Sequence, residues 1–345
     1  MIPTEPFSPP PPPARPVLDL LVPALRAILY LVVYVATQIA VVLPLHALGP
    51  LLDPNFFRKG GFGTANEVFL VAVVLAVPLQ ILITWPFTRF LDHRSLASLG
   101  ARAPVGGRGA ALRQLIEAPL GAVAVLGIWL VLILALPAAY AAVHFAGISP
   151  GFTHPPDWWH FPPALLLLLL LPGFVLQGGL EEWIVRGYVY HTLRERWRPW
   201  TAALGSSLLF GLLHAGNPNV SLSALLNVVL AGMVLAALVE RTGSLWSATL
   251  AHGAWNFAVA CLLSVPVSGV RLFRLFDVSI TGDPRLTGGG FGPEGSWLLT
   301  LIGIPLTAVL WRGIWRRPSE RAQARSAAAV APLSASEDIS PPFLP

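Results

Sequence analysis

The sequence predicts an all-α fold, a multi-spanning bundle of about eight transmembrane helices. Three observations indicate this fold class. The 345-residue chain is 55% hydrophobic and only 11% charged, a composition too apolar for a soluble domain. Its apolar residues gather in segments long enough to cross a bilayer, at about 20 residues each. Its arginines gather between those segments, which is typical of the cytoplasmic loops of membrane proteins.

The apolar segments define the expected helices in chain order. They cover residues 18–46, 67–91, 113–146, 163–189, 201–217, 220–239, 243–264 and 295–312. Only Asn217-Pro218-Asn219, a turn-forming sequence, divides the fifth segment from the sixth. The proline-rich residues 1–16 lack the features of a secretory signal, and we expect a disordered tail there. The Ala/Ser/Pro-rich stretch 313–345 is expected to form a second such tail.

The arginines orient the expected bundle. If eight spans alternate, the arginine-rich loops after the second, fourth and sixth spans lie on one side, together with the stretch after the eighth. These arginines are Arg89, Arg94, Arg102, Arg108, Arg113, Arg194, Arg196, Arg198, Arg241, Arg312, Arg316 and Arg317. We therefore expect a multi-pass protein of the cell membrane with both termini in the cytoplasm. The loop 265–294 is the exception, because it would carry Arg271, Arg274 and Arg285 outside.

Composition and polar patterning argue against several classes of protein. The net charge is +5, but the basic residues form no single patch, so no nucleic-acid partner is expected. Cys261 is the only cysteine, which excludes an internal disulfide framework and a cysteine-based zinc cluster. A secondary transporter would favour paired halves with broken helices in each, whereas the polar residues here occur only in the later half.

The first group of polar residues ends the leucine-rich fourth segment. Glu181, Glu182 and Arg186 lie within six residues, although an ionisable side chain in a bilayer costs about 2.5–3.5 kcal/mol. On a helix Glu182 and Arg186 share a face and can pair, while Glu181 points about 100° away and has no partner within its own helix. Gly178 and Gly179 leave room for a neighbouring helix. A buried ion pair that only fixes helix packing is the alternative interpretation.

Two further polar groups follow in the later spans. Phe210 and His214 lie one turn apart in the fifth span, although a lone intramembrane histidine often serves only packing. His252 and Asn256 share a face of the seventh span, with Gly253 beside them, and such a donor pair suits a developing oxyanion. An interhelical hydrogen-bond contact is the structural alternative. Glu181 and His252 each lie about ten residues from an arginine of the expected cytoplasmic loops, so we expect them at one depth in the membrane. His214, about fifteen residues from Arg198, is expected somewhat deeper.

These residues, in this order, resemble the motifs of a known family. Glu181-Glu182-x-x-x-Arg186, Phe210-x-x-x-His214 and His252-x-x-x-Asn256 are similar to the EExxxR, FxxxH and HxxxN motifs of the CPBP family of intramembrane proteases. This family includes the CAAX prenyl endopeptidases and the bacteriocin-processing or Abi proteins. The resemblance covers about residues 163–264. It carries no information on the first three spans or on the loop 265–294.

The resemblance implies an endopeptidase whose site lies in the bundle core and opens to the cytoplasm. Carried over residue by residue, it makes Glu181 the general base for the attacking water, with His214 helping to hold that water. His252 and Asn256 would stabilise the oxyanion, and Glu182, Arg186 and Phe210 would support the site. The substrate would be a membrane-associated peptide or protein. The chain then divides into the tail 1–16, N-terminal transmembrane helices at 17–162, a catalytic core at 163–264, an extracytoplasmic loop with the last helix at 265–312, and the tail 313–345.

Metal dependence and catalysis itself each leave an alternative open. The family is commonly called metalloprotease, and Glu181, His214 and His252 would be the ligands of a zinc ion with an open fourth position. These ligands come from separate helices without HExxH spacing, and a metal-free water activated by Glu and His fits equally well. The alternative function is a non-catalytic membrane scaffold or bacteriocin-immunity protein with the same fold. The intact motifs favour the protease.

Overall fold

The computed structural model describes residues 16–52, 78–100, 107–152, 163–271 and 273–314. Nearly all of both expected tails, residues 67–77 of the second expected span and parts of several loops lie outside these residues. Most of the described chain is helical, as the composition predicts.

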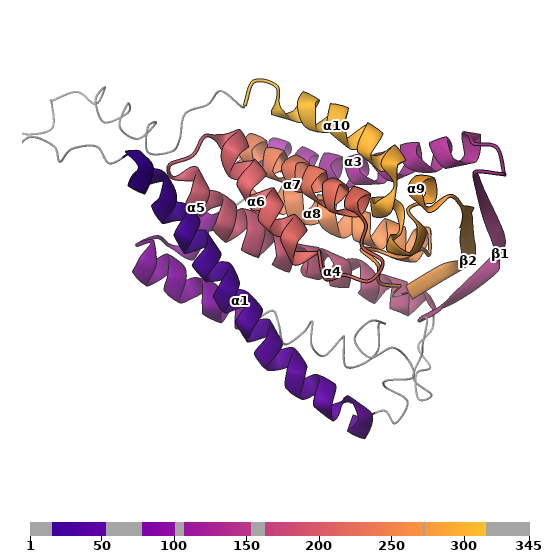
Figure 1. The fold of residues 1–345 in the computed structure, drawn as a ribbon, viewed down its shortest axis with the longest axis horizontal. Coiled ribbons are helices and arrows are strands. Elements are labelled where there is room, and N and C mark those ends of the chain that lie inside the picture. Colours follow the sequence, from indigo (N-terminus) through magenta and orange to yellow (C-terminus); the bar gives the residue numbers. More distant parts are fainter. Residues whose placement is uncertain (1–15, 53–77, 101–106, 153–162, 272, 315–345) are drawn as a thin grey trace, which may run out of the picture.

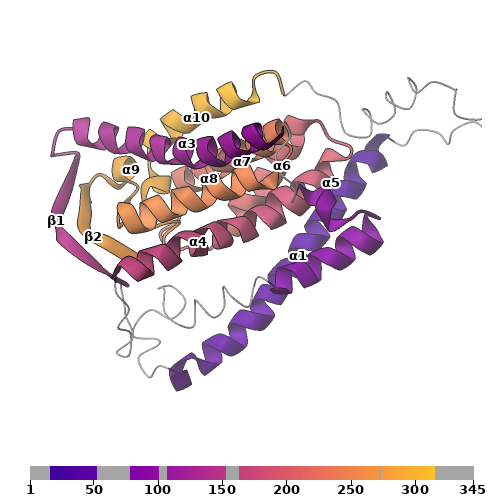
Figure 2. The same cartoon turned by 180° about the vertical axis from the view of Figure 1, so that it is seen from behind.

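Four described helical segments precede the motif-bearing part of the chain. Helix α1 (Pro16–Leu52) is long and runs obliquely away from the bundle (Figure 1). Residues 78–86 are α-helical and continue into the π-helix η2 (Phe87–Leu91), and the short 3-10 helix η3 (Leu96–Leu99) follows. Helix α3 (Gly107–Ala135) then packs against the later helices of the bundle (Figure 2).

The remaining helices form the bundle that carries the motifs. They are α4 (Pro163–Glu182), the π-helix η4 (Trp183–Tyr190), α5 (His191–Arg194), α6 (Pro199–Leu213), α7 (Leu222–Thr242), α8 (Leu245–Phe257), the π-helix η5 (Ala258–Leu262) and α10 (Trp297–Trp311). The turn from α7 to α8 is tight because Gly243 takes a left-handed conformation at φ 63°. Ser244 then caps α8 by accepting a hydrogen bond from the backbone N–H of Trp246.

A two-stranded sheet corrects the all-α prediction. Strand β1 (Ala141–Phe152) pairs antiparallel with β2 (Phe273–Gly282), from Ala141 opposite Gly282 to Phe152 opposite Phe273. The third helix therefore ends at Ala135 and does not continue to residue 146. Pro137 explains this end, because a proline disfavours helical geometry in the residue before it. Apolar composition alone does not distinguish the start of strand β1 from a continuation of helix α3.

The loop between η5 and α10 contains short helices in addition to its β-strand. It contains β2 and the short helices α9 (Pro284–Thr287), η6 (Gly289–Phe291) and η7 (Pro293–Gly295). Asn227 of α7 anchors its end by donating to the carbonyl oxygens of Glu294 and Ser296, each at 2.8 Å. This loop therefore packs on the bundle.

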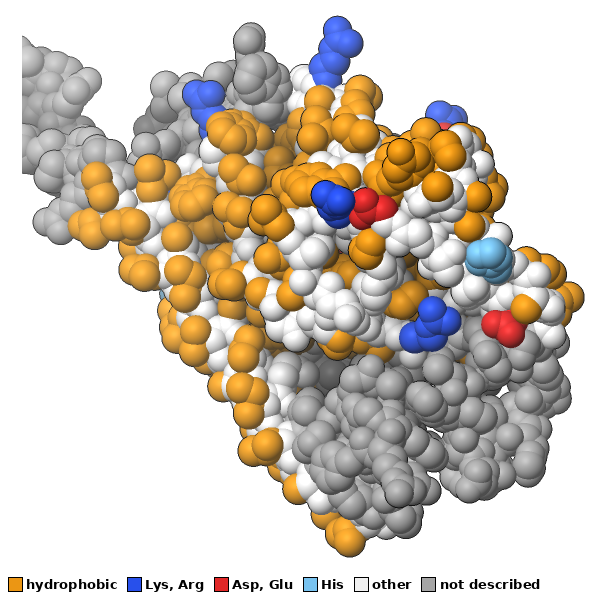
Figure 3. Space-filling view, turned by 45° about the vertical axis from the view of Figure 1, so that its right-hand side comes forward, with side chains coloured by type: hydrophobic (Ala, Val, Ile, Leu, Met, Phe, Trp, Pro, Cys, Tyr) orange, Lys and Arg blue, Asp and Glu red, His pale blue; other side chains and the backbone are white. Residues whose placement is uncertain are grey.

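The predicted number of spans is supported only in part. Within the described residues, three helices are long and apolar enough to cross a membrane, at Val17–Val41, Ala111–Ala135 and Leu222–Thr242. Helices α6 and α10 are apolar but shorter. The count of about eight spans is therefore not confirmed. Hydrophobic side chains nevertheless cover much of the face in Figure 3, with only isolated charges among them, as expected of a surface that meets lipid.

The loops that we expected on one side of the membrane do gather at one end of the bundle. Arg26 forms ion pairs with Asp92 and with Glu195, and Arg94 lies 3.2 Å from Glu195. The turn between α7 and α8 lies at the same end. The backbone N–H of Leu245, the first residue of α8, donates to the carbonyl oxygen of Gly100. Strands β1 and β2 lie at the opposite end (Figures 1 and 2). Which compartment each end faces stays a prediction.

Cysteine labelling tests that prediction. Ser98 lies in η3 and Ser279 is exposed in β2, so the two residues mark opposite ends of the molecule. In intact cells, a membrane-impermeant thiol reagent should label Ser279→Cys and leave Ser98→Cys unlabelled until the membrane is permeabilised. The native Cys261 is fully buried, and a Cys261→Ala background removes it altogether. Labelling of both positions from one side would refute the expected topology.

Candidate active site

Glycine residues bring α4 and α8 into backbone contact. A Cβ atom added at Gly178 would lie 3.0 Å from the backbone nitrogen of Gly253, and one added at Gly253 would lie 2.6 Å from Val175 Cα. Separations this short leave no space for a side chain. The expectation that these glycines let a neighbouring helix approach is therefore confirmed. The contact sets the end of α4, with its two glutamates, beside His252.

Glu182 is the centre of a buried charged group. Its Oε1 accepts hydrogen bonds from Arg186 NH1 and from His252 Nδ1, both at 2.9 Å, and the Glu182 and Arg186 side chains are each 0% exposed. The expected pairing of these two residues is thus confirmed. A carboxylate only accepts hydrogen bonds, so His252 must carry a proton on Nδ1. Nε2 is then the ring nitrogen of His252 that is left for chemistry.

The guanidinium group of Arg186 packs between the Phe210 ring and Gly232. Its guanidinium carbon lies 4.6 Å from the centre of the Phe210 ring, within the range of a cation–π interaction. On another side Gly232 of α7 provides space, since a Cβ there would lie 2.8 Å from Arg186 NH2 and 2.6 Å from Ser207 Oγ. Phe210 therefore contacts the ion pair, and the supporting role that the resemblance gives it stays a prediction.

Glu181 lies beside this group but is more accessible. Its side chain is 29% exposed, and its Oε2 lies 3.8 Å from His252 Nε2. Gln177 Nε2 donates a hydrogen bond to the other oxygen, Oε1. The prediction that Glu181 has no partner within its own helix is therefore wrong. Gln177 precedes Glu181 by four residues, the spacing of side chains on one helix face, so the sequence did carry this signal.

Asn256 extends the same network. Its Nδ2 donates to Gln177 Oε1 at 2.9 Å, and the residue is only 5% exposed. His252 and Asn256 therefore both face α4, as their spacing on α8 predicts. Their contacts are different, however, because His252 meets the two glutamates and Asn256 meets Gln177. The structure thus brings Glu181, Glu182, Arg186, His252 and Asn256 together.

His214 lies at the edge of this arrangement. It is the C-cap residue of α6, its Nδ1 donates to the carbonyl oxygen of Phe210 at 2.9 Å, and its ring lies 4.4 Å from the Phe210 ring. Within the described part of the chain, no hydrogen bond joins His214 to Glu181, His252 or Asn256. Its carbonyl partner again fixes the proton on Nδ1 and leaves Nε2 as the open nitrogen.

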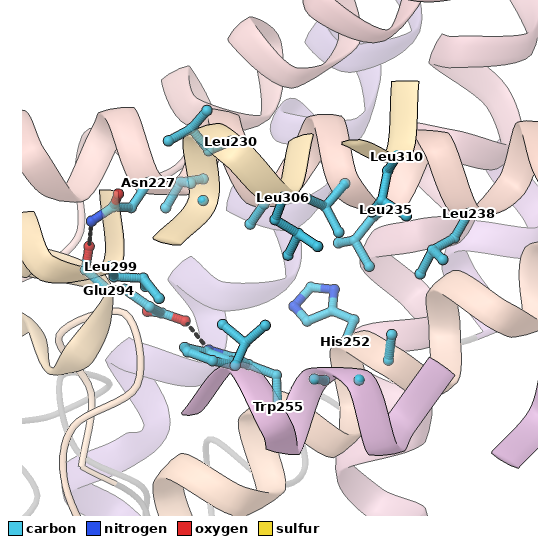
Figure 4. Close-up of a pocket in the computed structure, with 18 of the residues that line it drawn as sticks. Asn227, Leu230, Leu235, Leu238, His252, Trp255, Glu294, Leu299, Leu306 and Leu310 are labelled. Carbon is cyan, nitrogen blue, oxygen red and sulfur yellow. Dashed lines mark hydrogen bonds between the residues drawn. The ribbon is translucent and has the colours of Figure 1, made fainter. Parts of the chain in front are cut away.

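A cavity of about 330 Å³ connects the two histidines. His214 and His252 both line it, and most of the other lining side chains are apolar residues of α3, α7 and α10. Figure 4 shows the His252 ring facing this space opposite Leu306 and Leu235. At one end, Trp255 Nε1 donates to Glu294 Oε1 at 2.8 Å. A mostly apolar cavity with a few polar groups is typical of a site that binds an apolar ligand or side chain.

The residues proposed as zinc ligands do not form a metal cluster. Among the described residues, no group of three His, Cys, Asp or Glu side chains has the geometry to hold a metal ion. Glu181 and His252 are close, but His214 contacts Phe210 instead of joining them. The donor set therefore does not fit a three-ligand zinc site.

A comparison with known families identifies this part of the chain. Residues 162–258 match the family model described as "Type II CAAX prenyl endopeptidase Rce1-like". Residues 162–258 are a CPBP-family domain. This domain contains all of α4, α6, α7 and α8, and so every motif residue described above. No curated protein sequence matches the chain significantly. The Rce1-like family is a protease family, so the match supports a membrane-embedded enzyme of the CAAX-protease type.

The α4–α8 contact of the CPBP-family domain can be tested by one methyl group. Gly253→Ala would push α8 away from the Val175 backbone, and overpacking of this kind costs about 1–3 kcal/mol. We expect a lower melting temperature and a loss of any cleavage activity, because His252 and Asn256 would move away from α4. Gly173→Ala in α4 is the matched control, since a Cβ there meets no atom within 4 Å. Equal melting temperatures for the two variants would contradict the packing argument.

Proposed function

We propose that this protein is an intramembrane endopeptidase that hydrolyses a peptide bond of a membrane-associated peptide or protein by means of a Glu181-activated water. One observation carries the proposal. A partly exposed carboxylate, Glu181, faces the open ring nitrogen of His252 at 3.8 Å within a CPBP-family domain. The other ring nitrogen of His252 is held by a buried ion pair, so the imidazole is oriented before substrate binds.

Glu181 is the general base in this proposal. It takes a proton from water as the water oxygen bonds to the peptide carbonyl carbon, which produces a tetrahedral oxyanion. The proton then passes to the amide nitrogen as the C–N bond breaks, and the amine leaves. Water supplies the hydroxyl group and the proton that are added when the C–N bond breaks, so this hydrolysis needs no further reactant. Glu182 cannot take this role, because it is fully buried and its Oε1 already accepts from Arg186 and His252.

The two histidines provide the groups that face the substrate. Each imidazole has its Nδ1 proton engaged, by Glu182 in His252 and by the Phe210 carbonyl in His214. In the neutral form each Nε2 can accept a hydrogen bond from the attacking water, and when protonated it can donate to the oxyanion. Asn256 has one amide hydrogen bonded to Gln177, so only its second hydrogen is free for an oxyanion.

The cavity next to His252 supports an apolar, membrane-associated substrate. Its lining is mostly Leu, Val and Ala, and it lies inside a bundle whose surface is itself apolar. We further propose that both termini face the cytoplasm and that the site opens to that side, as the arginine distribution predicts.

Mapping of peptide termini tests the function before any substrate has been identified. Membranes of cells that express the wild-type chain should contain new protein termini that are absent from cells expressing Glu181→Gln at the same level. Termini that are equally abundant in both would argue for the alternative, a scaffold that binds peptides without cleaving them.

A further inference from the structure

The amide side chain of Gln177 links Asn256 on α8 to Glu181 on α4. Gln177 Nε2 donates to Glu181 Oε1, and Asn256 Nδ2 donates to Gln177 Oε1 at 2.9 Å. The orientation of both amides follows from the carboxylate. Because a carboxylate only accepts, the Gln177 nitrogen must face Glu181, and its oxygen must then face a donor on Asn256. The three side chains therefore form a directed relay that crosses the α4–α8 contact.

We propose that Gln177 is a positioning residue for Glu181 and that Asn256 influences catalysis mainly through Gln177. This inference rests on the function proposed above. The sequence motif gave Asn256 a direct role at the oxyanion. The structure instead engages its amide nitrogen with Gln177 and buries the side chain to 5% exposure. Asn256 is also absent from the described residues that line the cavity, unlike His252.

The relay distinguishes the two oxygens of the Glu181 carboxylate. Gln177 holds Oε1, and Oε2 is the oxygen that lies 3.8 Å from His252 Nε2. Without Gln177, this 29% exposed side chain would lose the hydrogen bond that the described structure gives it within α4. It could then rotate into other rotamers, and fewer molecules would present Oε2 to the water beside His252. Glu182 needs no such help because two donors and complete burial fix it.

A loss of positioning should lower turnover and spare binding. A reacting group misplaced by about 1 Å can cost about 10²-fold in rate. We therefore expect Gln177→Met, which keeps the length of the side chain and removes its hydrogen bonds, to lower kcat by about 10–100-fold with little change in KM. Asn256→Leu should lower kcat by no more than this, because Gln177 would still contact Glu181.

The decisive experiment is a double-mutant cycle on the full chain in detergent, with a fluorogenic membrane-anchored peptide as substrate. If Asn256 acts through Gln177, the Gln177→Met/Asn256→Leu double variant should have the kcat of Gln177→Met alone. If Asn256 donates directly to the oxyanion, the two losses should multiply, and that result would overturn its assignment to the relay. A Gln177→Met variant with wild-type kcat would overturn the relay while the Glu181 mechanism stands. Absence of cleavage by the wild type would overturn both proposals.

A second variant tests the direction of the relay with almost no change in volume. Asn256→Asp replaces the donor that faces Gln177 by an acceptor, so the Gln177 amide should turn its nitrogen toward residue 256 and its oxygen toward Glu181. We expect a larger loss of kcat than for Asn256→Leu, and no additional loss when Gln177→Met is also present. Melting temperatures identify variants that fail to fold. A folded Asn256→Asp protein with wild-type kcat would contradict the relay.

Discussion

Replacing Glu181 by glutamine should stop cleavage without unfolding the protein. Glutamine has the size of glutamate, and its amide oxygen can still accept the hydrogen bond from Gln177. It cannot take a proton from water. Because general-base catalysis contributes about 10²–10⁴-fold, kcat should fall by at least that factor. The measurement is cleavage of a fluorogenic membrane-anchored peptide by purified, detergent-solubilised protein, with the melting temperature recorded for each variant.

Asp277→Asn is a suitable control for the Glu181 experiment. Asp277 is an exposed carboxylate in β2, at the opposite end of the molecule from α5, and it should be neutral for both activity and stability. A folded Glu181→Gln protein with undiminished kcat would show that another group acts as the base. His252 would then be the next candidate, because its Nε2 is the nearest open nitrogen.

Replacing Glu182 by alanine should mainly destabilise the protein. The change leaves the fully buried Arg186 without its ion-pair partner, and two of its nitrogens, Nε and NH2, already lack a hydrogen bond in the described structure. Removal of one partner of a buried pair costs about 3–5 kcal/mol. His252 would also lose the acceptor for its Nδ1 proton. We expect a much lower yield of folded protein and a lower melting temperature.

A compensating variant separates the two functions of Glu182. Replacing both partners by apolar residues, in Glu182→Leu/Arg186→Met, removes the unpaired charge and should recover much of the lost stability. Cleavage should stay low in this double variant, because the Nδ1 proton of His252 then lacks the carboxylate that holds the ring in place. If Glu182→Ala melts at the wild-type temperature, the ion pair does not stabilise the bundle as argued. If the double variant cleaves normally, Glu182 does not orient His252.

Local spacing was sufficient to predict several features of the site. Glu182 and Arg186 are four residues apart on one helix, so helical geometry alone predicts that they can pair, and they do. Gly178 and Gly253 predicted a close helix approach because a missing side chain is visible in any sequence. Helix positions followed from apolar length in the same way, with α6, α7 and α10 found where the hydrophobic segments placed them.

The tertiary structure decided what depends on residues far apart in the chain. Residues 141–146 belong to the same predicted apolar segment as the helix before them, yet they form part of β1 because β2, over a hundred residues later, supplies the backbone partners. Gln177 was visible as a neighbour of Glu181, but only the approach of α8 gives its oxygen a partner in Asn256. His214 likewise shares a cavity with His252, although their separation in sequence says nothing of this. The sequence alone thus determined contacts within a helical turn, where backbone geometry sets the distance. Contacts between elements depended on packing, because no local rule brings distant residues to one position in space.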